Sequence, residues 1–435
     1  MNTKFAPYAV IGNLTQWGRT LCSPFLAAFA LLVSSSLLWY TNGAMRHFLL
    51  YPVLSPLFLY QAAVALIALG LMGTAALNFW FFRKPRAFAA GASQDTLPMI
   101  SVLVPARDEA ENIEACVKSL LALNYPHFEV VVLDDHSSDD TYAILCRLRD
   151  RDYRLRVLIG ADLPPDWYGK PFACWQLAKA AQGELLLMTD ADCVFAPDAL
   201  LLALGARQEH QAEVVSLVPD LRCDGFWERL LIPIQYFVIF AFLPTPLIRR
   251  TPYPWFAAAN GAFLFLSRET YFEVDGHRAV RQQLAEDVKF AQHVKRSGKS
   301  LWYGDGSRTY FVRMYRGLDE LWEGFAKNLF PAFSHNLPLL LWVVFLIVNV
   351  FVLPPLWALW GWGSGAGWTF LPLGAYLGLA AVRLGLTLRF GRDSPGYALL
   401  NPLAWSFVAG IALSSAFLSL SGRGNTWKGR VYRQR

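Results

Sequence analysis

Long apolar segments alternate with a more polar middle along the chain. Residues 21–40 are nearly free of charge and about as long as a bilayer-crossing helix needs to be. A second apolar run, residues 49–82, ends at the basic stretch 83–86. We expect residues 1–90 to form an N-terminal transmembrane hairpin with both ends in the cytosol. A polar linker at residues 91–98 follows.

Three more apolar segments lie near the end of the chain, at residues 337–360, 368–390 and 399–420. We expect residues 337–420 to be transmembrane helices, followed by a basic tail at residues 421–435. Three full crossings from the cytosol would leave this tail outside, which the positive-inside rule opposes. Our candidate for a re-entrant segment is the last one, with Asn401-Pro402 near its start, but the sequence pattern leaves the question open.

The middle of the chain alternates short β-branched runs with amphipathic stretches. The predicted strands are residues 100–104, 129–133, 155–159 and 184–188. Helices are expected at residues 111–123 and 288–296. This alternation indicates an α/β domain with a mostly parallel sheet, in which ligands bind at the carboxyl ends of the strands. Residues 230–248 are apolar but contain three prolines, which favours a surface-lying or buried helix over a crossing.

Composition supports this division. The 435 residues are 55% hydrophobic and only 17% charged, which is too apolar for an ordinary soluble enzyme. The net charge is +6, but the basic residues lie largely beside apolar segments rather than in a stripe. We therefore expect anionic lipid headgroups as partners and no nucleic acid. Six cysteines without a C-x-x-C pair argue against a zinc site or a disulfide framework and favour reduced thiols; no cleavable signal peptide is expected.

An acidic pair follows the last predicted strand of the middle domain. Asp190 and Asp192, one residue apart, can share a divalent cation such as magnesium or manganese, whose coordination is commonly completed by substrate phosphates. The alternative is a solvated acidic loop. The position directly after a buried strand favours the cation.

A second acidic pair, Asp134 and Asp135, follows the second predicted strand. Carboxylates there can accept hydrogen bonds from a uracil ring or a ribose. The alternative role is capping of a helix N-terminus, which Ser138 or Asp139 can also fill. Two adjacent acids at the strand end are more than a cap requires.

Three further positions carry candidate donor-binding groups. The first strand ends in a stretch containing Pro105, Arg107 and Glu109, where the arginine can meet a diphosphate and the glutamate a nucleoside. An ordinary charged loop is the alternative. Lys170 closes an aromatic turn and suits a phosphate, while Gly169 before it permits close backbone approach. A plain surface turn is the alternative.

Two candidate groups lie later in the chain. Glu286 and Asp287 open a predicted helix, where an acid is often only a partner of the helix dipole. Asp287 also suits a general base that removes a proton from an attacking hydroxyl. Arg313 and Arg316 precede the membrane segments and can meet a diphosphate leaving group, or simply anchor lipid headgroups.

In this order, the clusters resemble inverting family 2 glycosyltransferases of the GT-A fold, and we place such a domain at residues 98–330. The stretches that resemble its opening, nucleoside, metal and base motifs are residues 104–109, 134–141, 190–192 and 286–287. A narrower resemblance, to bacterial carotenoid glucosyltransferases and hopanoid-associated glycosyltransferases, is carried by residues 167–174, 313–316, 323–325 and 426–430.

The resemblance implies a metal-dependent enzyme that uses a uridine diphosphate sugar, glucose by the narrower match, and glycosylates a hydroxylated or carboxylated lipid. From the apolar segments and the positive-inside rule, we expect a multi-pass protein of the inner (plasma) membrane with a cytoplasmic catalytic domain. Processive synthases carry Gln-x-x-Arg-Trp after the base motif; nothing here matches it, so transfer of a single sugar is expected. Residue 285 is Ala where many relatives have Thr, so the base assignment depends on Asp287.

Other functions remain open at this stage. The acceptor can instead be a polyprenyl phosphate, a hopanoid or a glycerolipid. A non-enzymatic alternative is a membrane binding protein with an inactive transferase-like domain. A transporter is disfavoured because the apolar segments carry little charge beyond Arg383.

Overall fold

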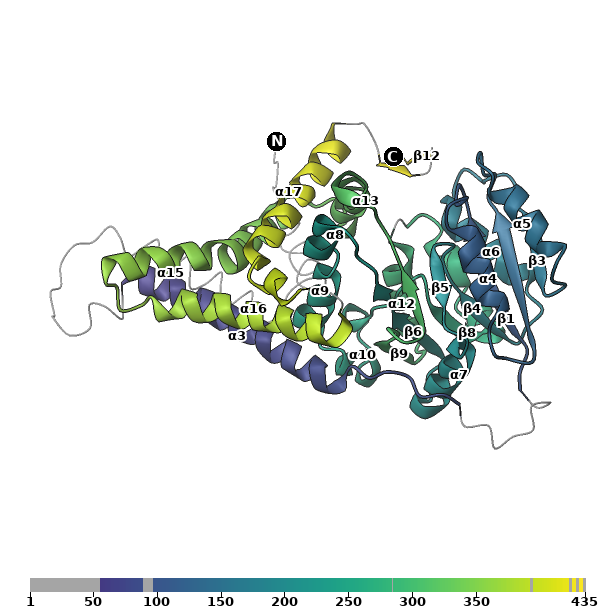
Figure 1. Ribbon diagram of the computed structural model, residues 1–435, viewed down its shortest axis with the longest axis horizontal. Coiled ribbons are helices and arrows are strands. Elements are labelled where there is room, and N and C mark those ends of the chain that lie inside the picture. Colours follow the sequence, from purple (N-terminus) through teal and green to yellow (C-terminus); the bar gives the residue numbers. More distant parts are fainter. Residues whose placement is uncertain are drawn as a thin grey trace, which may run out of the picture.

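The computed structural model describes residues 55–88, 97–283, 285–391, 394–421, 425–427 and 430–432. The predicted crossing at residues 21–40, and Cys22 with it, lies outside these residues. An α/β domain occupies one end of the molecule, and the helices α3 (Pro56–Phe81), α15 (Leu353–Ser364) and α16 (Phe370–Phe390) extend away from it at the other end (Figure 1).

A seven-stranded sheet forms the centre of the α/β domain, in the order β3-β2-β1-β4-β8-β6-β9. Its strands are β1 (Ile100–Ala106), β2 (Phe128–Asp134), β3 (Leu155–Ile159), β4 (Leu185–Met188), β6 (Val214–Val218), β8 (Leu264–Ser267) and β9 (Leu301–Asp305). All neighbours pair in parallel except β8, which is antiparallel to both β4 and β6. The predicted, mostly parallel sheet is therefore confirmed.

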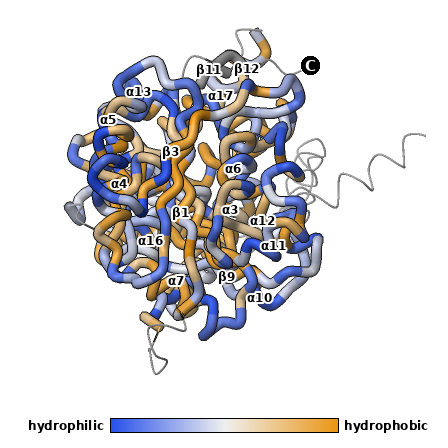
Figure 2. Tube along the Cα trace, turned by 90° about the vertical axis from the view of Figure 1, so that its right-hand side faces the viewer, coloured by the Kyte–Doolittle hydropathy of each residue, from blue (hydrophilic) through white to orange (hydrophobic). Residues whose placement is uncertain are grey.

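Helices cover both faces of this sheet. Successive residues of a strand face opposite sides, so each strand contributes to two cores. On β1, Val102 belongs to a core that includes Val117, whereas Leu103 belongs to a second core that includes Leu177. The helices of the domain are α4 (Ile113–Leu121), α5 (Thr141–Arg149), α6 (Gly169–Ala180), α7 (Ala199–His210), α11 (Arg268–Glu273) and α12 (Glu286–Arg296), with the 3₁₀ turn η4 (Gly276–Val280). Figure 2 shows the hydrophobic central strands surrounded by hydrophilic outer turns.

The α/β domain also contains a small second sheet. It consists of β5 (Cys193–Phe195), β10 (Tyr310–Val312) and β7 (Asp220–Leu221), in the order β5-β10-β7. Val312 pairs with Cys193 on one side and with Leu221 on the other. This register places Arg313 beside Asp192, because the chain direction of β10 is opposite to that of β5.

The apolar segment at residues 230–248 is divided among short helices. They are α8 (Phe226–Leu231), α9 (Ile234–Phe242) and α10 (Pro246–Arg250), followed by the 3₁₀ turn η3 (Pro254–Phe256). The expectation of one continuous helix was wrong, because Pro233 and Pro244 fall between these helices and lack the N–H that a helix interior needs. Asn78 of α3 donates to the carbonyls of Phe240 (2.8 Å) and Leu243 (2.6 Å) and so holds the end of α9.

Four helices of the described residues are long and apolar enough to cross a membrane: Pro56–Phe81, Leu337–Ser364, Phe370–Phe390 and Asn401–Leu420. The first is α3, the second comprises α14 (Leu337–Ile347), the π-helical turn η5 (Val348–Val352) and α15 (Leu353–Ser364), and the last two are α16 and α17. The linking and terminal elements are α13 (Gly317–Ala332), η6 (Pro395–Ala398), β11 (Asn425–Trp427) and β12 (Arg430–Tyr432).

An ion pair ties the membrane helices to the sheet. Arg389, in the last turn of α16, lies 3.1 Å from the carboxylate of Asp305, which is fully buried at the end of β9. Arg389 also donates to the carbonyls of Phe79 and Phe82 at the end of α3. The Arg389 guanidinium therefore joins the ends of α3 and α16 to the carboxyl end of β9.

Candidate active site

The predicted motifs meet at one edge of the large sheet. Ala106 and Asp134 are paired as the last residues of β1 and β2. The backbone N–H of Asp135 donates to the Ala106 carbonyl (2.8 Å), and that of Thr189, just after β4, donates to the Leu103 carbonyl (3.1 Å). Carboxyl ends of parallel strands therefore bring the opening, nucleoside and metal motifs together.

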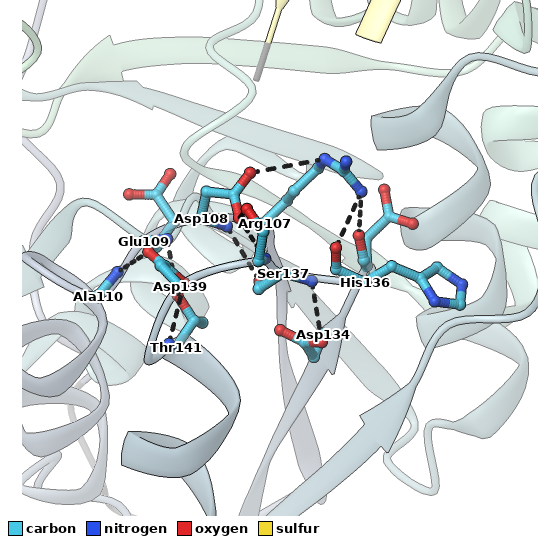
Figure 3. Close-up of polar contacts among 11 residues, drawn as sticks. Arg107, Asp108, Glu109, Ala110, Asp134, His136, Ser137, Asp139 and Thr141 are labelled. Atoms are coloured by element: carbon cyan, nitrogen blue, oxygen red, sulfur yellow. Dashed lines mark hydrogen bonds and ion pairs between the residues drawn. The ribbon is translucent and has the colours of Figure 1, made fainter. Parts of the chain in front are cut away.

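Arg107 braces the nucleoside loop from within (Figure 3). Its Nη1 donates to the backbone carbonyls of Asp135 (2.5 Å) and His136 (3.3 Å). His136 has a φ of 55° and Asp108 a φ of 51°, a left-handed conformation that bulky residues rarely adopt. In this arrangement the guanidinium fixes the loop that carries the acidic pair.

The opening and nucleoside loops are joined by side chains from both. Asp108 accepts hydrogen bonds from the N–H (2.6 Å) and hydroxyl (3.0 Å) of Ser138. The N–H of Glu109 donates to Thr141 Oγ1 (2.8 Å), and the N–H of Ala110 donates to Asp139 (2.9 Å). Asp139 thus links two loops rather than only capping α5. The network makes a single rigid wall from two separate motifs.

One carboxylate oxygen of Asp134 accepts no hydrogen bond from the described residues. Its side chain is 5% exposed, and Oδ2 accepts from the N–H of Ser137 at 3.2 Å. Oδ1 is buried and has no hydrogen-bond partner among the described residues. A buried carboxylate oxygen without a partner is costly unless a ligand supplies a donor. Asp135 is equally buried beside it.

Lys170, Asp190 and Glu286 form a chain of charges. Lys170 stands at the start of α6, and its Nζ lies 2.7 Å from Asp190 Oδ1 and 2.9 Å from Glu286 Oε1. Burial alone lowers the pKa of the lysine, but the charges of the two acids outweigh it and raise that pKa well above its usual value. The lysine therefore joins the metal motif to the base motif, which lie almost 100 residues apart in the chain.

The two acids of the metal motif have different surroundings. Burial, and then the negative charges of Asp190 and Glu109, raise the pKa of Asp192 to about 7. Its Oδ1 lies 3.5 Å from the thiol of Cys193. In contrast to Asp190, Asp192 forms no ion pair with Lys170. A carboxylate of this kind is stabilised in its charged form by any cation placed next to it.

The pair fits a divalent cation that shares its coordination with a substrate. Within the residues that the structure describes, no group of three His, Cys, Asp or Glu side chains is placed to hold a metal ion. Magnesium and manganese sites often use one or two carboxylates and are completed by substrate phosphates and water. Asp190 and Asp192 can supply those two carboxylates.

Asp287 is held in place from two sides. Its Oδ2 accepts from the N–H of Gly261 (3.2 Å) and its Oδ1 from the N–H of Val288 (2.7 Å). Burial and the charge of Glu286 raise its pKa to about 6, against the opposing effect of Lys170. A Cβ at residue 261 would lie 3.2 Å from Lys170 Nζ, so glycine allows this close approach. A base with this pKa is charged at neutral pH and still accepts a proton readily.

The two arginines near the membrane have acidic partners. Arg313 lies 2.9 Å from Asp224 and 3.5 Å from Glu228, and Glu228 is 3% exposed. Arg316 lies 2.6 Å from Glu111, just after the opening motif. Arg313 follows Val312, which pairs with Cys193 next to the metal motif, whereas Arg316 connects the start of α13 to the residues after the opening motif.

Comparison with known proteins agrees with this geometry. Residues 101–288 match the family model described as glycosyl transferase family 2. Over these residues the chain is similar to glycosyltransferase family 2. The match contains the opening, nucleoside, metal and base motifs, and it ends at the start of α12.

Three relatives illustrate the range of similar glycosyltransferases. A β-monoglucosyldiacylglycerol synthase from Trichormus variabilis is 34% identical over 152 residues, but the match spans about a third of either protein, 34% of this chain and 32% of the relative. A 4,4'-diaponeurosporenoate glycosyltransferase from Staphylococcus aureus is 23% identical over 77% of this chain and 88% of its own. A mannosyltransferase from Pyrobaculum calidifontis, solved with GDP-mannose and Mn²⁺, has the same fold, with a TM-score of 0.50, 20% identity and coverage of 82% and 99%.

Several residues of the candidate site are not evident in the sequence. Glu286 stands in the base motif, but its ion pair with Lys170 depends on how α6 and α12 pack. Glu228 lies outside every motif and is the buried partner of Arg313. The only nearby sequence feature is Asp224, four residues earlier. The backbone N–H of Asp224 donates to the Glu228 carboxylate at 2.9 Å. Gly261 has no signal at all beyond being a glycine.

Proposed function

We propose that this chain transfers a single glucose from UDP-glucose to a hydroxyl group of a membrane lipid such as a carotenoid, with inversion at the anomeric carbon. The observation that carries the proposal is the contact of the metal motif and the base motif through Lys170, at 2.7 and 2.9 Å. One site then holds both a place for a diphosphate and a base for the acceptor.

The donor is bound by the nucleoside loop. Asp134 and Asp135 accept hydrogen bonds from the uracil and ribose, and Arg107 keeps their loop in position. Positive charge around the diphosphate comes from Lys170, Arg313 and Arg316. Each of them gives up part of its contact with an acidic side chain to contact the diphosphate. Pro105 and Glu109 complete the wall beside the nucleoside. Asp190 and Asp192 would hold a divalent cation, which offsets the charge of the departing uridine diphosphate.

Asp287 acts as the general base. As the acceptor oxygen bonds to the anomeric carbon, its proton passes to the Asp287 carboxylate, and the bond from that carbon to the diphosphate breaks on the opposite side. The hydrogen bond from the Gly261 N–H at 3.2 Å orients the Asp287 carboxylate and favours its ionised form. One displacement of this kind inverts the configuration.

The acceptor reaches the site from the bilayer. The loop after α10 carries Tyr253 and Trp255, half exposed and stacked with ring centroids 4.8 Å apart. Aromatic residues of this kind favour the membrane–water interface. The same loop continues to Gly261 at the base. A lipid can therefore keep its apolar body in the membrane while its polar end meets Asp287. We place the catalytic domain on the cytoplasmic side of the plasma membrane, with basic residues near the apolar segments.

A glycerolipid is the second candidate acceptor. It is favoured by the 34% identity over 152 residues to the β-monoglucosyldiacylglycerol synthase. The carotenoid is favoured by the longer match, which extends over 77% of this chain and so includes membrane segments. Parallel assays with a hydroxylated carotenoid and with diacylglycerol in the same membranes separate the two.

The activity itself is tested by hydrolysis and transfer assays on the purified chain. With Mn²⁺ and UDP-glucose alone, slow release of uridine diphosphate is expected, and added acceptor lipid should accelerate it. A chain that binds membranes but releases no uridine diphosphate under either condition is a binding protein with an inactive domain. Efficient transfer to soluble sugars, or formation of long glycans, would contradict the lipid acceptor.

A further inference from the structure

The last apolar helix differs from the other three in its path. We infer that α17 does not cross the membrane: the chain re-enters the bilayer after α16 and α17 returns it to the catalytic side. The chain then leaves α17 on the side of the membrane that faces the catalytic domain. Helix α17 has 20 residues, which is long enough for a crossing. The residues that α17 contacts therefore decide its path.

The far surface of the bundle is marked by tryptophans. Trp357 and Trp360, near the end of α15, cluster with Trp368, just before α16, with ring centroids 5.5–6.4 Å apart. Trp360 is 54% exposed. Tryptophan is enriched where helices meet the membrane–water interface. The turn between α15 and α16 is therefore the end of the bundle remote from the catalytic domain, as Figure 1 also shows.

The beginning of α17 lies beside the middle of α16. The hydroxyl of Tyr376 donates to the carbonyl of Leu399 at 3.0 Å, and Arg383 donates to Asn401 at 3.3 Å. Tyr376 is roughly 20 Å along the helix from Phe390, at 1.5 Å per residue. After α16 has ended near the catalytic domain, the chain thus runs back along it toward the bundle centre.

The rest of α17 runs toward the catalytic side. Trp405 stacks on Phe351 in the middle of the long helix, with ring centroids 4.2 Å apart. Further along α17, Ala412 and Ala416 pack on Leu340, close to the start of α14. Sequence order is therefore reversed between the two helices, and the end of α17 reaches the level at which α14 enters the bundle from α13.

The end of α17 is fastened to α13. Ser415 accepts from the N–H of Phe330 (2.9 Å) and donates to the Ala326 carbonyl, and Trp322 Nε1 donates to Ser414 at 3.2 Å. α13 begins directly after Arg316, which reaches the nucleotide side of the site. Figure 1 shows α17 slanting away from α3 and α16 toward α13, with the terminal strands beyond it. β11 also contacts α13.

The outward face and the tail suit a lipid leaflet. α17 leaves apolar side chains exposed, namely Leu403, Leu413, Phe417 and Leu420. The sequence after it contains five basic residues and no acidic one: Arg423, Lys428, Arg430, Arg433 and Arg435. Basic residues next to a membrane helix are attracted to anionic headgroups and are retained on the cytoplasmic side. The inferred path removes the conflict that three full crossings would create.

The test compares the side of the tail with that of two reference positions. The same protease-cleavable epitope is placed in three versions of the full chain: after Arg435, at the 94% exposed Tyr153 of the catalytic domain, and between Ala366 and Gly367 at the far turn. Sealed right-side-out and inverted vesicles are treated with an impermeant protease. Retained glucosyl transfer shows that each version is folded.

The tail epitope should be cleaved in the same vesicles as the Tyr153 epitope, and the epitope at residue 366 in the opposite vesicles. Cleavage of the tail together with the epitope at residue 366 would overturn the inference. Trypsin treatment of the unmodified chain gives the same comparison without insertions. Mass spectrometry should then find fragments cut at Arg423 and at Arg151 from the same vesicle orientation; release of the two from opposite orientations would contradict it.

Discussion

Lys170 Nζ lies 2.7 Å from Asp190 Oδ1, so the first turn of α6 carries the positive charge that faces the metal motif. The same ammonium lies 2.9 Å from Glu286, beside the proposed base. Acidic groups that would otherwise repel one another are thereby held around one cation. The relationship explains how motifs from distant parts of the chain are held together.

Replacing Lys170 by Met should weaken binding of uridine diphosphate by about 1–3 kcal/mol, because one partner of a charged hydrogen bond is removed. Glucosyl transfer should fall at least as much. The matched control is Lys179→Met on the same helix, whose ammonium lies over Trp175 instead. Calorimetric titration of nucleotide into both variants measures the effect, and equal affinity in the two would remove Lys170 from the donor site.

Replacing Asp134 by Ala tests the nucleoside pocket. The unpartnered Oδ1 is expected to receive a donor from the nucleotide, so its loss should weaken uridine diphosphate binding by about 1–3 kcal/mol. Asp150→Ala, at an exposed ion pair with Arg149, serves as the control. A purine nucleotide should bind equally poorly to both proteins. If uridine diphosphate binds the Asp134→Ala variant normally, the nucleoside lies elsewhere.

Asp192 should link stability to pH and to metal. Its pKa is about 7 in the folded, metal-free chain, above the usual aspartate value of about 3.9 expected when unfolded. Its stabilising contribution is therefore complete below about pH 3.9 and is lost as pH rises through about 7. Asp192→Asn should raise the metal-free unfolding temperature at pH 8 more than at pH 5, and should abolish transfer.

Mn²⁺ should raise the unfolding temperature of the unmodified chain, because an ion that binds only the folded state stabilises it. The Asp192→Asn variant should lose this stabilisation, because one of the two proposed carboxylate ligands is removed. Thermal unfolding in detergent, with chelator or with Mn²⁺, measures both effects. Asp319→Asn, in the first turn of α13, is the control. Full transfer activity in excess chelator would contradict the metal assignment.

The sequence predicts the parallel half of the fold well. The runs that form β1, β2, β3 and β4 have strong apolar contrast with their surroundings, and all seven residues of β2 are buried. The strand Leu264–Ser267 is not evident in the sequence, because so short a run in an aromatic-rich region gives no distinct period. Its antiparallel place between β4 and β6 is a tertiary property.

The site residues are likewise predicted by their position after strands, but their contacts are not. Arg107 was expected to face a diphosphate, and in the structure it holds the carbonyls of Asp135 and His136. The bridge from Lys170 to Glu286 depends on the packing of α6 against α12, which no local pattern records. Sequence spacing thus predicts which residues follow the strand ends, whereas the partner of each charge depends on packing.

Asp287 gives the sharpest prediction on mechanism. A neutral hydroxyl acceptor needs proton removal, so kcat/KM should rise with pH through about 6, the pKa of this carboxyl. Asp287→Asn should slow single-turnover transfer by about 10²–10⁴-fold and remove this rise, while donor affinity stays within a few-fold. Collapse of donor binding in the variant would instead make Asp287 a structural residue.

Transfer of a single glucose to a lipid is measured with labelled donor. Membranes containing the unmodified chain or the Asp287→Asn variant are incubated with radiolabelled UDP-glucose, Mn²⁺ and a lipid extract of the native host, and the lipids are then extracted and analysed by mass spectrometry. We expect label in a lipid that carries one added hexose, only with the unmodified chain. Label confined to the aqueous phase, or found in a polymer, would contradict it.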